Sequence, residues 1–161
     1  FGNTLCAVEV TGQEIMDFLE HVNQFVQAEA SSDGLAVGED GSFQQVSGLK
    51  FTVDTSIPSS VVLDENGMFV SIEGERRVKD IMILNDSGEY EPIVADQTYT
   101  MASHNYLIKE SGSATDMFLD NVLLIDEGMI DYEILINYIT ENLNGELSGL
   151  YSETEGRITI Q

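Results

Sequence analysis

Short runs in which hydrophobic and polar residues alternate recur along most of the chain, the pattern of strands with one buried face. This alternation predicts strands at residues 4–10, 49–53, 61–63, 68–72, 78–84, 90–94 and 99–104. Asn66-Gly67 separates the third and fourth of these and is typical of a hairpin turn. A short strand is expected at 156–160, where the chain closes.

Two segments show helical spacing instead. After Thr11-Gly12-Gln13-Glu14, apolar residues recur every three or four positions, so we expect a helix from about residue 12 to about residue 28. Thr11 and Glu14 fit a capping box, in which each side chain bonds the backbone N–H of the other. Asp131 is predicted to cap a second helix that Asn144-Gly145 ends. Its apolar stripe consists of Tyr132, Leu135, Ile136, Tyr138 and Ile139.

Two helices separated by a strand-rich middle are typical of an α+β domain rather than of a βαβ array. The 161 residues are enough for one domain with its own core. With no internal repeat and no linker, we predict a single domain at 1–161 with mixed sheets and two main helices. No apolar run is long enough to cross a membrane as a helix, so no membrane span is expected.

The charge is strongly acidic, with 29 Asp and Glu against six Lys and Arg, a formal net charge of −23 at pH 7. Nucleic acid is therefore not expected as a partner, because binding a phosphate backbone requires a basic face. The acids are spread along the chain, as on a solubilising surface. An anionic small molecule would need cations supplied from elsewhere.

Residue types that carry catalysis are few. His21 lies on the first predicted helix and suits a structural or solvated role, whereas His104 could contact a ligand. Cys6 has no cation near it in sequence and suits a small buried hydrophobe. The sequence contains no nucleophile elbow, no phosphate-cradling glycine motif and no His/carboxylate cluster with metal-ligand spacing. These observations favour a binding module with neither catalytic residues nor a metal site of its own.

Four segments in a fixed order then point to a family. FGNTL, TGQEIMDFLEHV, VSGLKFTVD and TYTMASHNYL follow one another along the chain. Together they resemble the C-terminal domain of the 5′-nucleotidases, a family that includes UDP-sugar hydrolases and 2′,3′-cyclic phosphodiesterases. The closing GRITI is similar to the end of this domain in long bacterial members. The resemblance implies the fold of that domain and a nucleotide or nucleoside as ligand.

The resemblance also implies a longer parent protein, a phosphoric ester hydrolase of the 5′-nucleotidase type. Family enzymes have an N-terminal metallophosphoesterase domain that holds two divalent metal ions, and the C-terminal domain binds the nucleoside. This chain contains none of the N-terminal motifs, and it lacks the early Asn-Gly-Gly-Gly-Ile-Arg segment whose Arg contacts phosphate. We therefore expect a non-catalytic fragment that partners this N-terminal domain. The expected location is extracellular, cell-wall-attached or periplasmic.

Two positions match the aromatic residues that sandwich the base in the family. Phe1 stands in the FGNT motif, and Tyr106 follows Asn105 at the end of the late strand. The resemblance thus implies Phe1, Asn105 and Tyr106 as substrate-binding residues. Stacking of a base on an aromatic ring contributes about 1–3 kcal/mol. Taken singly, Phe1 also fits a core residue and Tyr106 a half-buried loop tyrosine.

One position departs from the family pattern. After the second aromatic the family carries Gly-Gly-Asp-Gly, whose Asp holds the ribose hydroxyls, and Ser113 stands in the place of that Asp. A carboxylate can accept from two hydroxyls, whereas one serine hydroxyl cannot hold both equally well. Ser113 is therefore a candidate substrate-binding residue with altered ribose recognition. It also motivates a second hypothesis, a non-catalytic binding or surface-interaction module with a decayed nucleoside site.

Overall fold

The computed structural model describes residues 2–27 and 41–161, and in it the chain clusters into two compact units. Unit 1 comprises the described residues of 1–10, 98–112 and 116–155. Unit 2 comprises the described residues of 11–97, 113–115 and 156–161. Phe1 lies outside the described residues. The predicted α+β class with mixed sheets and two main helices is confirmed.

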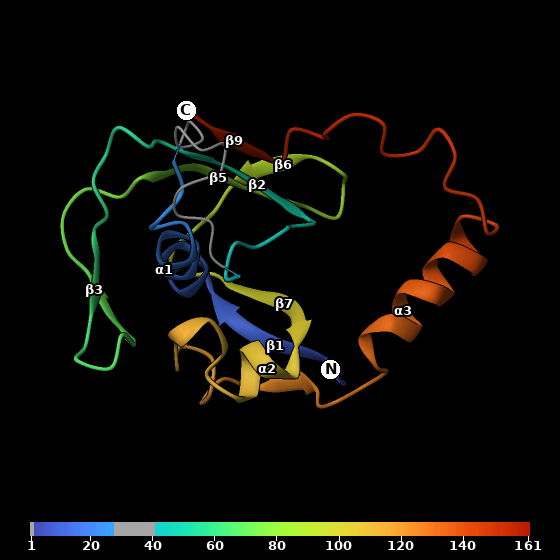
Figure 1. Ribbon diagram of the computed structural model, residues 1–161, viewed down its shortest axis with the longest axis horizontal. Helices are drawn as coiled ribbons and strands as arrows, with labels where there is room; N and C mark the ends of the chain where they lie inside the picture. Colours follow the sequence, from blue (N-terminus) through green and yellow to red (C-terminus); the bar gives the residue numbers. More distant parts are fainter. Residues whose placement is uncertain (1, 28–40) are drawn as a thin grey trace, which may run out of the picture. The chain divides into compact units, whose positions relative to one another are not determined.

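Unit 1 is built on a sheet of three strands, β1 (Leu5–Thr11), β7 (Thr98–His104) and β8 (Leu123–Ile125), in the order β7-β1-β8 (Figure 1). β1 and β8 are antiparallel. The helix α2 (Asn105–Lys109) follows β7 directly, and a turn at Gly112–Ala114 comes next. After β8 comes α3 (Asp131–Asn137), which a π-helical turn at Tyr138–Asn142 continues. The buried apolar side chains of this unit are Cys6, Ala7, Val8, Val10, Leu107, Ile108 and Phe118.

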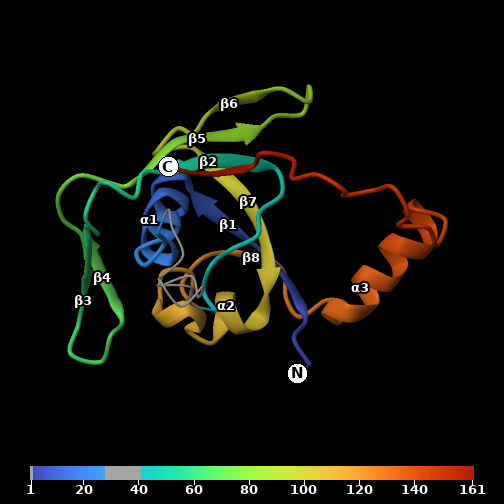
Figure 2. The same cartoon turned by 45° about the horizontal axis from the view of Figure 1, so that its top comes forward.

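Unit 2 contains a sheet of four strands in the order β6-β5-β2-β9, formed by Tyr90–Pro92, Val78–Leu84, Leu49–Val53 and Ile158–Ile160 (Figure 2). β2 pairs antiparallel with β5 and parallel with β9, so the sheet is mixed. The strands β3 (Val61–Leu63) and β4 (Phe69–Ile72) form the predicted hairpin. The helix α1 (Gly12–Val22) packs against β4 and β5. Its buried apolar residues are Ile15, Phe18, Leu19 and Val22.

The first helix begins as predicted but ends earlier. The Thr11 hydroxyl accepts from Glu14 N at 3.2 Å and the Glu14 carboxylate accepts from Thr11 N at 2.6 Å, so the capping box is confirmed. The helix stops at Val22 rather than near residue 28. The Arg77 guanidinium donates to three carbonyl oxygens that follow the helix, and it thereby replaces the next helical turn as their partner. These are Asn23 O at 3.2 Å, Gln24 O at 2.7 Å and Val26 O at 3.0 Å.

The prediction that Asp131 caps the second helix is wrong. Ile130 occupies the N-cap position, since its carbonyl accepts from Glu133 N and Ile134 N, and its aliphatic side chain makes no capping bond. Asp131 is the first helical residue, and its carboxylate accepts from Tyr132 N at 2.6 Å. The predicted end is confirmed, since positive φ angles at Asn144-Gly145 follow the helical run. Within the described residues, no helix has the length and apolarity needed to cross a membrane.

Candidate functional site

Tyr106, the predicted stacking residue, lies in the first turn of α2, directly after β7. His104 is the N-cap residue, and its Nδ1 accepts from Leu107 N at 3.1 Å. Leu107 and Ile108 are buried and anchor the short helix, whereas Tyr106 remains 51% exposed. The Tyr106 ring stacks on the His104 ring, with centroids 6.0 Å apart and an interplanar angle of 26°. The turn therefore holds an exposed aromatic ring on a fixed backbone, and a contact of His104 with a ligand stays a prediction.

Asn105 joins this turn to the beginning of β1. Its backbone N–H donates to Thr4 O at 2.9 Å, and Thr4 N donates to Asn105 Oδ1, also at 2.9 Å. The Asn105 Nδ2 donates to Glu110 at 3.1 Å. Both ends of the amide thus have protein partners, which gives Asn105 a positioning role. Phe1, the other predicted aromatic, precedes Thr4 by three positions and lies outside the described residues.

The loop after α2 packs closely on the Tyr106 turn. A Cβ at Gly112 would lie 2.5 Å from Tyr106 O and 2.9 Å from Leu107 Cα, so any side chain here would force the backbone apart. In the sequence this loop reads Ser111-Gly112-Ser113-Ala114, and nothing in that pattern distinguishes Gly112. A lone glycine in a polar loop gives no local signal of close backbone packing, so this residue was missed.

Ser113 belongs to unit 2, whereas Tyr106 belongs to unit 1. Its backbone is left-handed, with φ 58° and ψ 29°, and Ala114 follows with φ 54°. The Ser113 carbonyl accepts from Nε2 of His21 at 2.6 Å, while Gln24 Nε2 lies 3.2 Å from the other ring nitrogen of His21. His21 is buried in α1. His21 therefore has the structural role that was predicted, and it fixes the backbone at Ser113.

Lys109 is the only Lys or Arg in the sequence segments that form unit 1. Its Nζ donates to Asp126 at 2.7 Å and to Glu127 at 2.5 Å. The hydrogen bonds to Asp126 and then to Glu127 raise the pKa of Lys109 well above its ordinary value. The one cation of this unit is therefore committed to two carboxylates, and unit 1 offers no further Lys or Arg to a phosphate.

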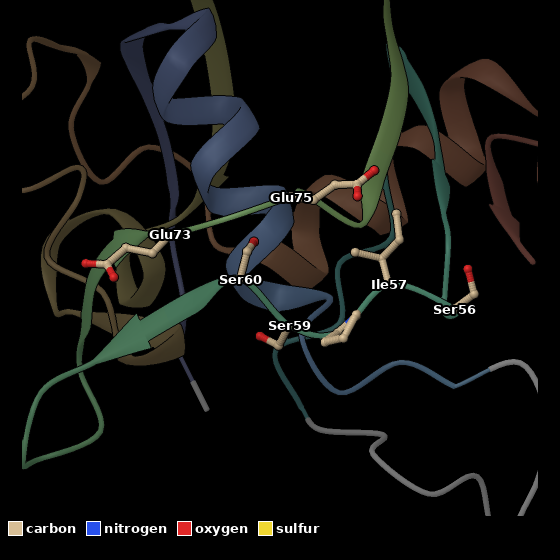
Figure 3. Close-up of a pocket in the computed structure, with 7 residues that line it drawn as sticks. Ser56, Ile57, Ser59, Ser60, Glu73 and Glu75 are labelled. Carbon is tan, nitrogen blue, oxygen red and sulfur yellow. The ribbon is translucent and has the colours of Figure 1, made fainter.

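An open pocket of about 350 Å³ lies in unit 2, between the segment that precedes β3 and the segment that follows β4 (Figure 3). Its lining residues are Ser56, Ile57, Pro58, Ser59, Ser60, Glu73 and Glu75. The two carboxylates would repel a phosphate group, and the pocket contains none of the predicted site residues. Among residues 2–27 and 41–161, no three His, Cys, Asp or Glu side chains gather in a way that could hold a metal ion.

The chain is similar in sequence and in fold to known proteins. The family model described as 5′-nucleotidase, C-terminal domain matches residues 1–120. The chain is 28% identical over 160 residues to the trifunctional nucleotide phosphoesterase protein YfkN of Bacillus subtilis (strain 168). It superposes on the 5′-nucleotidase precursor from Thermus thermophilus with a TM-score of 0.66 and 25% identity. It also superposes on the NAD nucleotidase of Haemophilus influenzae, with a TM-score of 0.61 and 16% identity, a likeness of fold.

These relatives are much longer than this chain. The alignment covers 98% of the chain but 9% of the Bacillus protein. The two superpositions cover 99% and 100% of the chain, and 25% of each solved relative.

Proposed function

Because the chain belongs to the family of 5′-nucleotidase C-terminal domains, we propose that it is the nucleoside-binding domain of a longer phosphoesterase. The parent hydrolyses nucleotides to nucleosides and phosphate outside the cytoplasm. Its N-terminal metallophosphoesterase domain holds two divalent metal ions, which activate the attacking water. Residues 1–161 form one 5′-nucleotidase C-terminal-like domain that positions the substrate and carries no catalysis of its own.

The observation that carries this proposal is the exposed Tyr106 ring, which follows Asn105 in a turn that hydrogen-bonds to Thr4 just before β1. Tyr106 stacks on one face of the base, and Phe1 stacks on the other. The paired hydrogen bonds between Thr4 and Asn105 support this arrangement, since they keep Thr4, three positions after Phe1 in the sequence, next to the Tyr106 turn. Asn105 acts in the site by setting the spacing of the two aromatic segments.

Calorimetry with adenosine and the longer protein tests the clamp. Tyr106→Ala removes one stack of about 1–3 kcal/mol, so we expect a Kd about 5- to 150-fold higher. Tyr106→Phe keeps the ring and should keep the affinity. Tyr151→Ala is the matched control, because Tyr151 is a similarly exposed tyrosine of the same unit. Adenosine binding that Tyr106→Ala leaves at the wild-type affinity would show that Tyr106 is not the stacking residue.

Ser113 is proposed to contact the ribose with its single hydroxyl. Ser113→Asp would supply an acceptor for both ribose hydroxyls, and aspartate tolerates the left-handed backbone found here. We expect this variant to bind adenosine more tightly than the wild type and to bind 2′,3′-dideoxyadenosine no better. An equal change for both ligands would argue against a ribose contact at this position.

The second candidate function is a non-catalytic binding or surface-interaction module, which Ser113 in place of the family Asp favours. Hydrolysis of AMP by the longer protein with Mn²⁺ separates the two candidates. Turnover by the longer protein supports the phosphoesterase. Adenosine binding without turnover of AMP, UDP-sugars or 2′,3′-cyclic nucleotides supports the module. Turnover of AMP by residues 1–161 alone would contradict the proposed absence of catalysis in this chain.

A further inference from the structure

The helical segment at 131–143 presents an apolar face that the described residues do not bury. Tyr132, Leu135 and Ile136 are 54%, 59% and 53% exposed, and Ile139 and Leu143 continue the same face at helical spacing. Neither α3 nor the π-helical turn has a buried residue. We call this surface the α3 face. It is an exposed apolar stripe along one side of the helix, whose other sides carry Asp131, Glu133, Asn137 and Glu141 together with Ile134 and Tyr138.

This helix lacks the packing that normally stabilises helices of its length. In Figures 1 and 2 the ribbon of α3 runs apart from β1 and β7, two of the three strands of its own unit. Its side-chain contacts include polar ones away from the α3 face, such as the Tyr138 and Tyr151 hydroxyls at 3.3 Å. The α-helix and the π-helical turn together span residues 131–142. Isolated helices shorter than about 12–15 residues are marginal in water, and most helical stability in proteins comes from packing an apolar face.

Charge argues against a second copy of the chain as the partner. Residues 116–155 contain no Lys or Arg. Their acidic residues are Asp116, Asp120, Asp126, Glu127, Asp131, Glu133, Glu141, Glu146, Glu153 and Glu155. Two copies joined through this region would bring like charges together, which disfavours association. A complementary partner has an apolar groove with Lys or Arg at its rim.

The length of the relatives leaves room for such a partner within the same polypeptide. This chain aligns with 25% of each of the two solved relatives, so three quarters of those proteins lie outside the aligned part. A groove on the same polypeptide acts at a high effective concentration and needs few contacts to hold a helix. We infer that the α3 face docks into an apolar, basic-rimmed groove formed by the part of the longer protein outside residues 1–161, as a helix-in-groove contact. This inference rests on the proposed function in requiring a longer protein.

Photo-crosslinking of the longer protein tests this inference. A benzophenone amino acid replaces Leu135 on the α3 face or, as the matched control, Asn137 on the opposite side of the helix. We expect Leu135 to crosslink, within one molecule, to a peptide outside residues 1–161, and Asn137 to give no such product. Crosslinks from Leu135 to residues 11–97, crosslinks between two copies, or equal behaviour at the two positions would overturn the inference.

Hydroxyl-radical footprinting of the unsubstituted protein gives a second measurement that needs no variant. Tyr132 lies on the α3 face, and Tyr138 lies about 120° around the same helix. The exposed fractions of 54% and 45% predict that Tyr132 oxidises at least as fast when the face is open. We expect the reverse order in the longer protein, and an unreversed order overturns docking. Hydrolysis of AMP, UDP-sugars and 2′,3′-cyclic nucleotides measured on the same sample separates the two ideas. Protection of Tyr132 without turnover of any of them refutes the phosphoesterase and leaves docking in place.

Discussion

The buried carboxylate of Glu20 connects α1 to two segments distant in sequence. Its Oε1 accepts from Ser60 Oγ at 2.7 Å and from Arg77 N at 3.0 Å, and its Oε2 accepts from Val78 N at 2.9 Å. The side chain has no exposed surface. We expect Glu20→Gln to destabilise unit 2, because an amide has one oxygen and turns its NH₂ group toward a backbone N–H that needs an acceptor.

The size of the effect follows from these three bonds. One backbone N–H of Arg77 or Val78 is left buried without an acceptor, which costs about 1–3 kcal/mol. The bonds that remain lose the negative charge, and charge-assisted bonds are stronger than neutral ones by about 1 kcal/mol each. An amide is also cheaper to bury than a carboxylate, which offsets part of this cost. The expected net loss of unfolding free energy is about 2–4 kcal/mol.

Urea denaturation followed by circular dichroism measures this loss. With an m-value of about 2 kcal/mol per M, the midpoint should fall by about 1–2 M. Glu75→Gln is the matched control, because it makes the same chemical change at a solvent-exposed carboxylate paired with Lys79. Solvent screens that pair, so its midpoint should stay close to that of the wild type. If the urea midpoint of Glu20→Gln were the same as that of Glu75→Gln, the assignment of Glu20 as the buried acceptor would be refuted.

Two further predictions concern turns. Gly112→Ala should weaken adenosine binding in calorimetry, because its Cβ would lie 2.5 Å from Tyr106 O. Gly41→Ala is the control: its Cβ would meet nothing within 4 Å, so this variant should bind adenosine with wild-type affinity. Equal affinities of the two variants would contradict the close packing at Gly112. Hydrogen bonding from the Met68 N–H and then from Asn66 lowers the pKa of Asp64 below its ordinary value of 3.8. A lowered folded-state pKa means that Asp64 stabilises the hairpin above its ordinary pKa and stops doing so as the pH falls through the folded value. An NMR titration should give a midpoint below 3.8, and a midpoint at or above that value would count against the turn geometry.

The strands were the part of the fold most accessible from the sequence. Predicted segments such as 49–53 and 78–84 coincide with β2 and β5. Alternation and turn residues are local signals, so they require no knowledge of distant partners. The apolar-rich segment at 117–125 was harder, because Asp120-Asn121 interrupts it and its apolar residues show neither strand alternation nor helical spacing. Only Leu123–Ile125 is a strand there.

The interactions that the sequence could not predict join residues far apart along the chain. Thr4 and Asn105 are 101 positions apart, and neither belongs to a pattern that requires the other. Glu20 and Arg77 are charged residues that local patterns place at the surface, yet both are buried. Each hydrogen-bonds to backbone groups more than 50 positions away, such as Val78 N for Glu20 and Asn23 O for Arg77. The Asn105–Tyr106 turn was singled out because the family resemblance, and not the local pattern, marked it.

The interleaving of the two units along the sequence constrains how the protein can be cut and how it folds. The chain passes between the units five times, after residues 10, 97, 112, 115 and 155. No single truncation therefore releases either unit whole. Removing the last few residues strips β2 of β9, whose Ile158 pairs with Phe51 across most of the sequence. Pairing between strands so far apart in sequence costs loop-closure entropy before the stabilising contacts form, and such pairing is typical of slow folding. Synthesis must therefore pass residue 160 before the four-stranded sheet can close.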